Sequence, residues 1–157
     1  MLRALERACV KFPFSASAPG ITTLRIYAVQ YAEPSLLETF YDTPAEVGAA
    51  IRAAAEFRGR DCAYLLGGYW DLWHWEGAWR LRPAPVQIGC YGPDFENEQG
   101  DHLRVELGLD SHFLPAPQAS AGDSKIQSNI RSVLRLAGNL DETLPVARRR
   151  LWTESGE

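Results

Sequence analysis

The sequence predicts a single α+β domain with a mainly antiparallel sheet of about five or six strands and two principal helices packed on one face. The length of 157 residues suits one hydrophobic core and is short for two ordinary domains. One helical stretch follows the first predicted strand, and a run of strands without alternating helices comes next, which disfavours a doubly wound fold. We therefore treat residues 1–157 as one domain, with a short amino-terminal helix and loop over 1–19 and the sheet-and-helix body over 20–157.

A short helix that packs on the body is predicted at the amino terminus. Apolar residues recur there at helical spacing: Leu2, Leu5, Ala8 and Cys9. Charged residues at positions 6, 7 and 11 interrupt any continuous apolar run, so we expect no signal peptide. No stretch reaches the roughly 20 apolar residues that a bilayer-spanning helix needs, and we expect no membrane partner.

The next two elements are a strand and a helix. Residues 21–32 are rich in β-branched and aromatic side chains, and Leu24, Ile26 and Ala28 alternate with outward positions. In residues 43–59, Thr43 is the expected N-cap, Pro44 the first helical residue, and Glu46 the partner of a capping box. Apolar residues form one stripe on this predicted helix: Val47, Ala50, Ile51, Ala54 and Phe57.

Three further strands and two helices complete the prediction. Residues 61–68 read as an apolar strand with a glycine pair, the tryptophan segment 67–83 as a hairpin, 86–92 as a short strand, and 102–109 as an alternating strand. Residues 114–124 have the composition of a surface loop. Ser124 is the expected cap of a helix with an apolar stripe, and Pro145 the start of a final short helix. That stripe comprises Ile126, Ile130, Val133, Leu134, Ala137 and Leu140.

Four of the five tryptophans lie within ten positions, 70 to 79. Successive side chains of a strand point to opposite faces, so Trp70, Leu72 and His74 share one face, and Asp71, Trp73 and Trp75 share the other. No register places all the tryptophans on one side. A three-residue turn at 75–77 is expected, with Gly77 in the left-handed conformation and Trp73 opposite Trp79.

Three interpretations of this hairpin remain open at the sequence level. In the first, both faces are covered and the tryptophans are core residues. In the second, part of one face is an aromatic platform for a peptide, sugar or planar ligand, with candidate binding residues Trp73, Trp75, Trp79, Arg80 and Arg82. In the third, the hairpin is a homodimer interface.

One alternative catalytic site deserves a test. His102 and His112, with Asp101, Asp110 and the more distant His74, are the only histidine and carboxylate set that suggests metal-activated water. The usual ligand spacings of metal-binding motifs are absent, so we favour no metal and expect no cofactor. A metal-dependent hydrolase using Asp101, His102, Asp110 and His112 is the alternative to a binding protein.

Composition narrows the function classes. The net charge of −4 and pI near 5.4 disfavour nucleic-acid binding and slightly favour basic over acidic partners. Three cysteines without metal-binding spacing fit a reducing cytoplasm. Nucleophile-elbow, phosphate-loop and dinucleotide motifs are all missing. The sequence therefore predicts a noncatalytic ligand- or protein-binding module that uses an aromatic hairpin surface.

Overall fold

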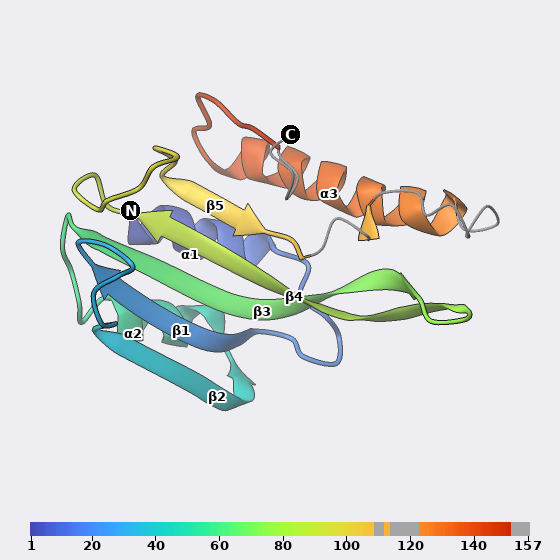
Figure 1. Cartoon of the computed structure of the whole chain (residues 1–157), viewed down its shortest axis with the longest axis horizontal. Helices are drawn as coiled ribbons and strands as arrows, with labels where there is room; N and C mark the ends of the chain where they lie inside the picture. Colours follow the sequence, from blue (N-terminus) through green and yellow to red (C-terminus); the bar gives the residue numbers. More distant parts are fainter. Residues whose placement is uncertain (109–111, 114–122, 152–157) are drawn as a thin grey trace.

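A computed structural model describes residues 1–108, 112–113 and 123–151 (Figure 1). In this part of the chain, one five-stranded antiparallel sheet has the strand order β2-β1-β3-β4-β5. The strands are β1 (Ile21–Ala28), β2 (Leu37–Ala45), β3 (Cys62–Trp75), β4 (Trp79–Tyr91) and β5 (Leu103–Glu106). The helices are α1 (Leu2–Lys11), α2 (Val47–Ala54) and α3 (Asp123–Thr143). The predicted α+β class with an antiparallel sheet is confirmed.

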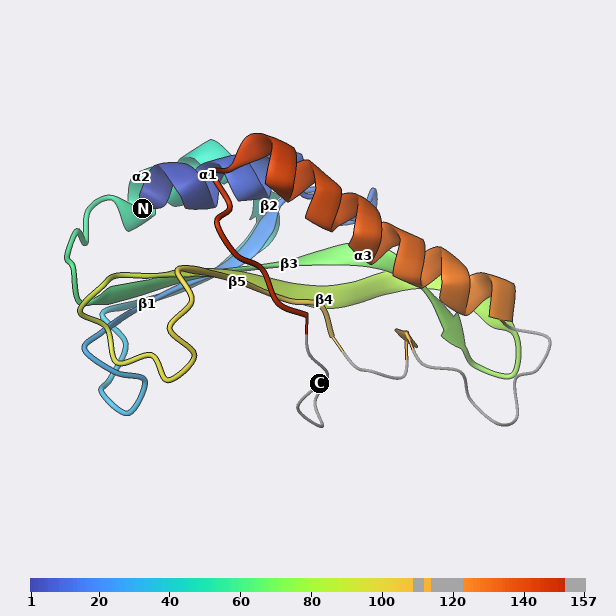
Figure 2. The ribbon, with the colours of Figure 1, turned by 90° about the horizontal axis from the view of Figure 1, so that it is seen from above.

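All three helices lie on the same face of the sheet, and the loops after β1 and β4 lie on the other (Figure 2). The main core forms between the helices and the inward residues of the strands, including Leu5 of α1, Leu24 of β1 and Leu66 of β3. α1 buries Leu5, Ala8 and Cys9, as its spacing predicts. No helix in the described ranges is long and apolar enough to cross a bilayer.

The chain between β1 and α2 differs from the prediction. Residues 37–45 form β2, which the sequence did not reveal, so Thr43 and Pro44 lie in a strand and not at a helix start. Pairing with β1, for example Phe40 opposite Thr23, holds this segment extended. Glu46 is the N-cap of α2 and makes no side-chain capping hydrogen bond. The predicted capping box is wrong, because a tertiary contact overrides a local signal.

The apolar stripe of α2 is confirmed, although the helix ends at Ala54 and not near Gly59. Ala50, Ile51 and Ala54 are buried, and the partly buried Phe57 packs on the same core beyond the helix.

β3 and β4 are continuous strands that pair along their whole length, from Ala63 opposite Tyr91 to Trp75 opposite Trp79. The predicted separate strand over 86–92 is therefore the second half of β4. Pro83 and Pro85 lie inside β4, beyond the stretch Gln87–Cys90 that pairs with β5. A proline is tolerated in a strand where one edge is free, since no partner there needs its missing N–H.

The predicted apolar stripe of α3 is confirmed in part, since Val133 and Leu140 pack against the core. Ile126, Asn129 and Leu136 are buried, whereas Ile130 and Leu134 of the predicted stripe are exposed. Asn129 lies on the inward face, where its amide bonds to the hairpin backbone. The final helix predicted from Pro145 is also wrong for the described residues, because 145–151 contain no helix. Most of the predicted 114–124 loop lies outside the described residues.

Candidate functional site

The tip of the β3–β4 hairpin sets which tryptophans meet. Trp75 pairs with Trp79 across a turn at 76–78, and their ring centroids lie 5.5 Å apart. Gly77 has φ +80°, so its predicted left-handed conformation is confirmed, although it is the middle and not the last residue of the turn. The predicted pairing of Trp73 with Trp79 is wrong, because the turn begins one residue later and places Trp73 opposite Leu81.

The two faces of the hairpin have different environments. Trp70 and Leu72 point into the core and are only 1% and 0% exposed. The Trp70 ring contacts Phe12, which follows α1, and Phe113, with centroid distances of 5.5 and 6.5 Å. The predicted division of the tryptophans between two faces is confirmed, and Trp70 and Leu72 are core residues.

The opposite face is partly exposed to solvent. We call it the hairpin face and define it by its outward aromatic and apolar residues: Tyr69, Trp73, Trp75, Trp79 and Leu81. Trp75 is 52% exposed and Leu81 is 54% exposed. Tyr69, Leu81 and their neighbours were missed as candidates, although extending the alternation of Trp73 and Trp75 along both strands would have found them.

The structure separates the two predicted arginines from the tryptophans. Arg80 pairs with His74 and Arg82 with Leu72, so both arginines start from the face opposite Trp75 and Trp79. The Arg82 side chain forms an ion pair of 3.0 Å with Glu76 in the turn. Of the five proposed binding residues, Trp73, Trp75 and Trp79 thus share one face, and the arginines do not join them.

α3 supports the hairpin through two residues that the sequence did not single out. The Asn129 Oδ1 accepts a hydrogen bond of 2.8 Å from the Trp73 N–H, and its Nδ2 donates bonds of 2.9 Å to the Trp73 and His112 carbonyls. The Lys125 Nζ lies 3.8 Å from the centroid of the Trp73 ring, a cation–π contact. The available signal was the position of Asn129, between Ile126 and Ile130 of the apolar stripe. These contacts hold the hairpin beyond Gly67, where its pairing with β1 ends.

The histidine and carboxylate set does not come together as one group. The His74 and His112 rings are 4.3 Å apart, and burial followed by the charge of His74 lowers the pKa of His112. His74 pairs with Arg80 near the start of β4. The His102 carbonyl, however, accepts a hydrogen bond from the Tyr91 N–H at the other end of that strand. At about 3.3 Å per residue, that separation is on the order of 30 Å.

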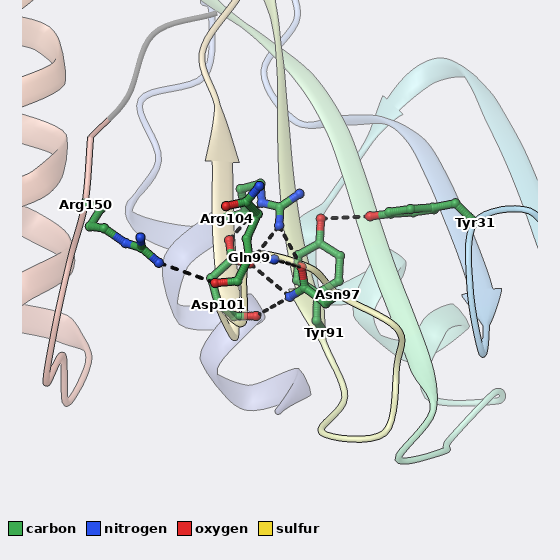
Figure 3. A network of polar contacts seen from close by, with 7 residues as sticks. All are labelled: Tyr31, Tyr91, Asn97, Gln99, Asp101, Arg104 and Arg150. Atoms are coloured by element: carbon green, nitrogen blue, oxygen red, sulfur yellow. Dashed lines mark hydrogen bonds and ion pairs between the residues drawn. The ribbon is translucent and has the colours of Figure 1, made fainter. Parts of the chain in front are cut away.

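Asp101 is engaged in a different network, shown in Figure 3. Arg104 donates to both of its carboxylate oxygens, at 2.8 and 2.7 Å, and the Asn97 Nδ2 donates to Oδ1 at 2.9 Å. Burial raises the pKa of Asp101, but the hydrogen bonds from Arg104 and Asn97 outweigh it and hold the pKa below its usual range. No group of three or more His, Cys, Asp or Glu side chains among the described residues could hold a metal ion. Asp110 lies outside those residues.

The same network lies on the face of the sheet that carries no helices, at the end farthest from the hairpin tip. The Arg104 guanidinium lies 4.8 Å from the centroid of the Tyr91 ring, and the Tyr31 hydroxyl donates to the Tyr91 hydroxyl at 2.8 Å (Figure 3). Arg150 also donates to the Gln99 carbonyl at 3.4 Å. These contacts fix the loop after β4 against the sheet and leave Arg104 committed to Asp101.

Comparison with models of known families, with curated proteins and with solved structures finds no match for this chain. The geometry of the site is therefore the basis of the functional argument.

Proposed function

We propose that this protein is a noncatalytic protein-binding module and that the hairpin face is its contact surface. The observation that carries the proposal is the exposure of Trp75 and Leu81 on one face of the hairpin, while Trp70 and Leu72 on the reverse face are buried in the core. Burying a half-exposed aromatic side chain against a partner is favourable in free energy relative to leaving it in water.

Contacts with the rest of the protein hold the hairpin face in one conformation, which favours a role in recognition. Full-length pairing of β3 with β4 fixes the backbone, and Asn129 ties Trp73 to α3. A preorganised surface loses little conformational entropy on binding, which leaves more of the contact energy as affinity. Tryptophan and tyrosine are also the residues that most often dominate binding energy at interfaces.

A pair of leucines provides a matched test. Leu81 lies on the hairpin face and is 54% exposed, whereas Leu134 lies on α3 and is 62% exposed. Leu81→Ser and Leu134→Ser remove the same side chain from two surfaces. We would express tagged parent and variants in the native host, crosslink, and quantify co-purifying proteins by mass spectrometry.

A specific partner should be recovered with the parent and with Leu134→Ser, and reduced at least tenfold with Leu81→Ser. Trp75→Ala should reduce it further, by roughly 30-fold if this side chain is a binding hot spot worth about 2 kcal/mol. Equal recovery with Leu81→Ser and Leu134→Ser would refute the proposal. A concentration-dependent dimer that Trp75→Ala abolishes, measured by sedimentation, would instead assign the face to self-association.

A further inference from the structure

A hollow of about 410 Å³ adjoins the hairpin face on the helix-free side of the sheet. Its floor follows one row of paired residues across four strands, since Thr23 pairs with Gly67, Gly67 with Gln87, and Gln87 with Glu106. Tyr69 and Pro85, which pair with each other, form the side nearer the hairpin tip. The floor of the hollow is thus built from regular strand positions.

Gly67 contributes no side chain to this row of paired residues. A Cβ atom at Gly67 would lie 2.1 Å from the Thr23 Oγ1, so the neighbouring side chain occupies the space above the glycine. At the far end of the row, Gly108 has φ +100° and allows the chain to turn away after β5.

Glu106, Thr23 and Gln87 supply polar groups in the hollow. Among the described lining residues, Glu106 is the only charged one. Its side chain is exposed and takes part in none of the ion pairs found between described residues. Thr23 and Gln87 add neutral hydrogen-bonding groups, and Tyr69 adds an aromatic ring that is 37% exposed. The hollow therefore combines one carboxylate, hydrogen-bond acceptors and an apolar wall.

The surrounding cations do not offset this charge. On the neighbouring row of the same face, Arg25 pairs with Glu38 at 3.0 Å and Arg104 pairs with Asp101 at 2.7 Å. Each guanidinium group is paired with its own carboxylate. Neither arginine therefore competes with an incoming cation for Glu106.

We infer that the hollow receives an arginine or lysine side chain from the partner protein, with its cationic group on Glu106 and its aliphatic stem against Tyr69 and Pro85. This inference rests on the proposed function and names the chemistry of the partner. A long basic side chain matches the site because it joins an apolar stem to a charged head, and cations are also attracted to aromatic faces. Gln87 and Thr23 can accept the remaining N–H groups of a guanidinium.

The first experiment is an NMR titration of the full-length, isotope-labelled protein with N-acetyl-arginine methylamide. N-acetyl-citrulline methylamide serves as the neutral probe of the same shape. The arginine probe should shift the amide signals of Gly67, Gln87 and Glu106, and the citrulline probe should bind at least threefold more weakly. Glu106→Gln should weaken the arginine probe by a factor of three to ten, whereas Glu56→Gln, which alters an exposed carboxylate after α2, should leave it unchanged.

Dispersed spectra would establish that each variant is folded before titration. Shifts scattered over the surface, equal binding of both probes, or no effect of Glu106→Gln would overturn the inference.

A second arm separates this inference from the proposed function. If Glu106→Arg leaves intact the recovery of a partner that Leu81→Ser removes, the hairpin face binds that partner and the basic side chain in the hollow is refuted. If recovery survives Leu81→Ser as well, the proposed function also fails. Loss of recovery with both variants, but not with Leu134→Ser, would support both.

Discussion

Replacing Asn129 tests the contact that joins α3 to the hairpin. Its amide is buried and satisfies three backbone groups: the Trp73 N–H, the Trp73 carbonyl and the His112 carbonyl. Asn129→Ala leaves all three without that partner, and a buried unsatisfied polar group costs about 1–3 kcal/mol. These groups are only partly buried, so water replaces some of the loss, and alanine regains about 0.5 kcal/mol of helix propensity. We expect a net destabilisation of about 2–3 kcal/mol.

Asn129→Asp separates hydrogen bonding from packing. Aspartate has nearly the same shape and can still accept from the Trp73 N–H, but an ionised carboxylate cannot donate to the two carbonyls it would face. We therefore expect Asn129→Asp to destabilise the protein at neutral pH at least as much as Asn129→Ala. Its deficit should shrink in acid, because the protonated carboxyl regains one donor and the folded state raises the pKa of the new group.

Urea unfolding followed by circular dichroism measures these changes, with Gln127→Ala, an exposed α3 position, as the control. Hydrogen exchange of the Trp73 amide provides a local readout, because Asn129 accepts its hydrogen bond. Destabilisation of Asn129→Ala below about 1 kcal/mol, or a near-neutral Asn129→Asp at pH 7, would refute the reasoning.

Three further predictions concern strain, titration and close contact. Val29 has φ 68°, which is strained for a β-branched residue. Val29→Gly should therefore raise the free energy of unfolding in urea by about 1 kcal/mol, and a lower value would contradict this. Burial raises the pKa of the Cys9 and Cys90 thiols to about 12. The unfolded chain releases these protons first, so unfolding free energy should fall as the pH rises from about 9 towards 12, and less steeply in Cys9→Ala/Cys90→Ala; equal slopes would contradict this. Gly67→Ala should destabilise by more than about 1 kcal/mol through its clash with Thr23, and adding Thr23→Ala should recover most of that loss in a double-mutant cycle.

Local periodicity was sufficient to predict several elements. The helical spacing of Leu5, Ala8 and Cys9 identifies α1, and the alternation of Leu103 and Val105 identifies β5. These patterns are reliable because each element must bury one face, and the spacing of apolar residues reports that face directly.

Other features depend on partners distant in the sequence. β2 is an edge strand with an apolar residue, Phe40, on its exposed face (64% exposed), so its sequence lacks the apolar–polar alternation that would have revealed it. The burial of Asn129 on α3 goes with its contact to the backbone of Trp73, which lies 56 positions away in the sequence. The hairpin turn begins one residue later than predicted, which shifts the register by two residues on one strand and changes the partner of Trp73 from Trp79 to Leu81, and no local signal fixed it.

For the candidate site, the sequence by itself determined that the tryptophans divide between two faces, because side chains of a strand alternate. Only the tertiary structure decided which face is exposed. α1, α2 and α3 all lie on the side of Trp70, where Phe12 and Phe113 cover it, and the opposite side retains Trp75 and Leu81 in contact with water (Figure 2). A strand pattern specifies two faces, but the packing of helices that come before and after it in the chain decides which of them becomes core.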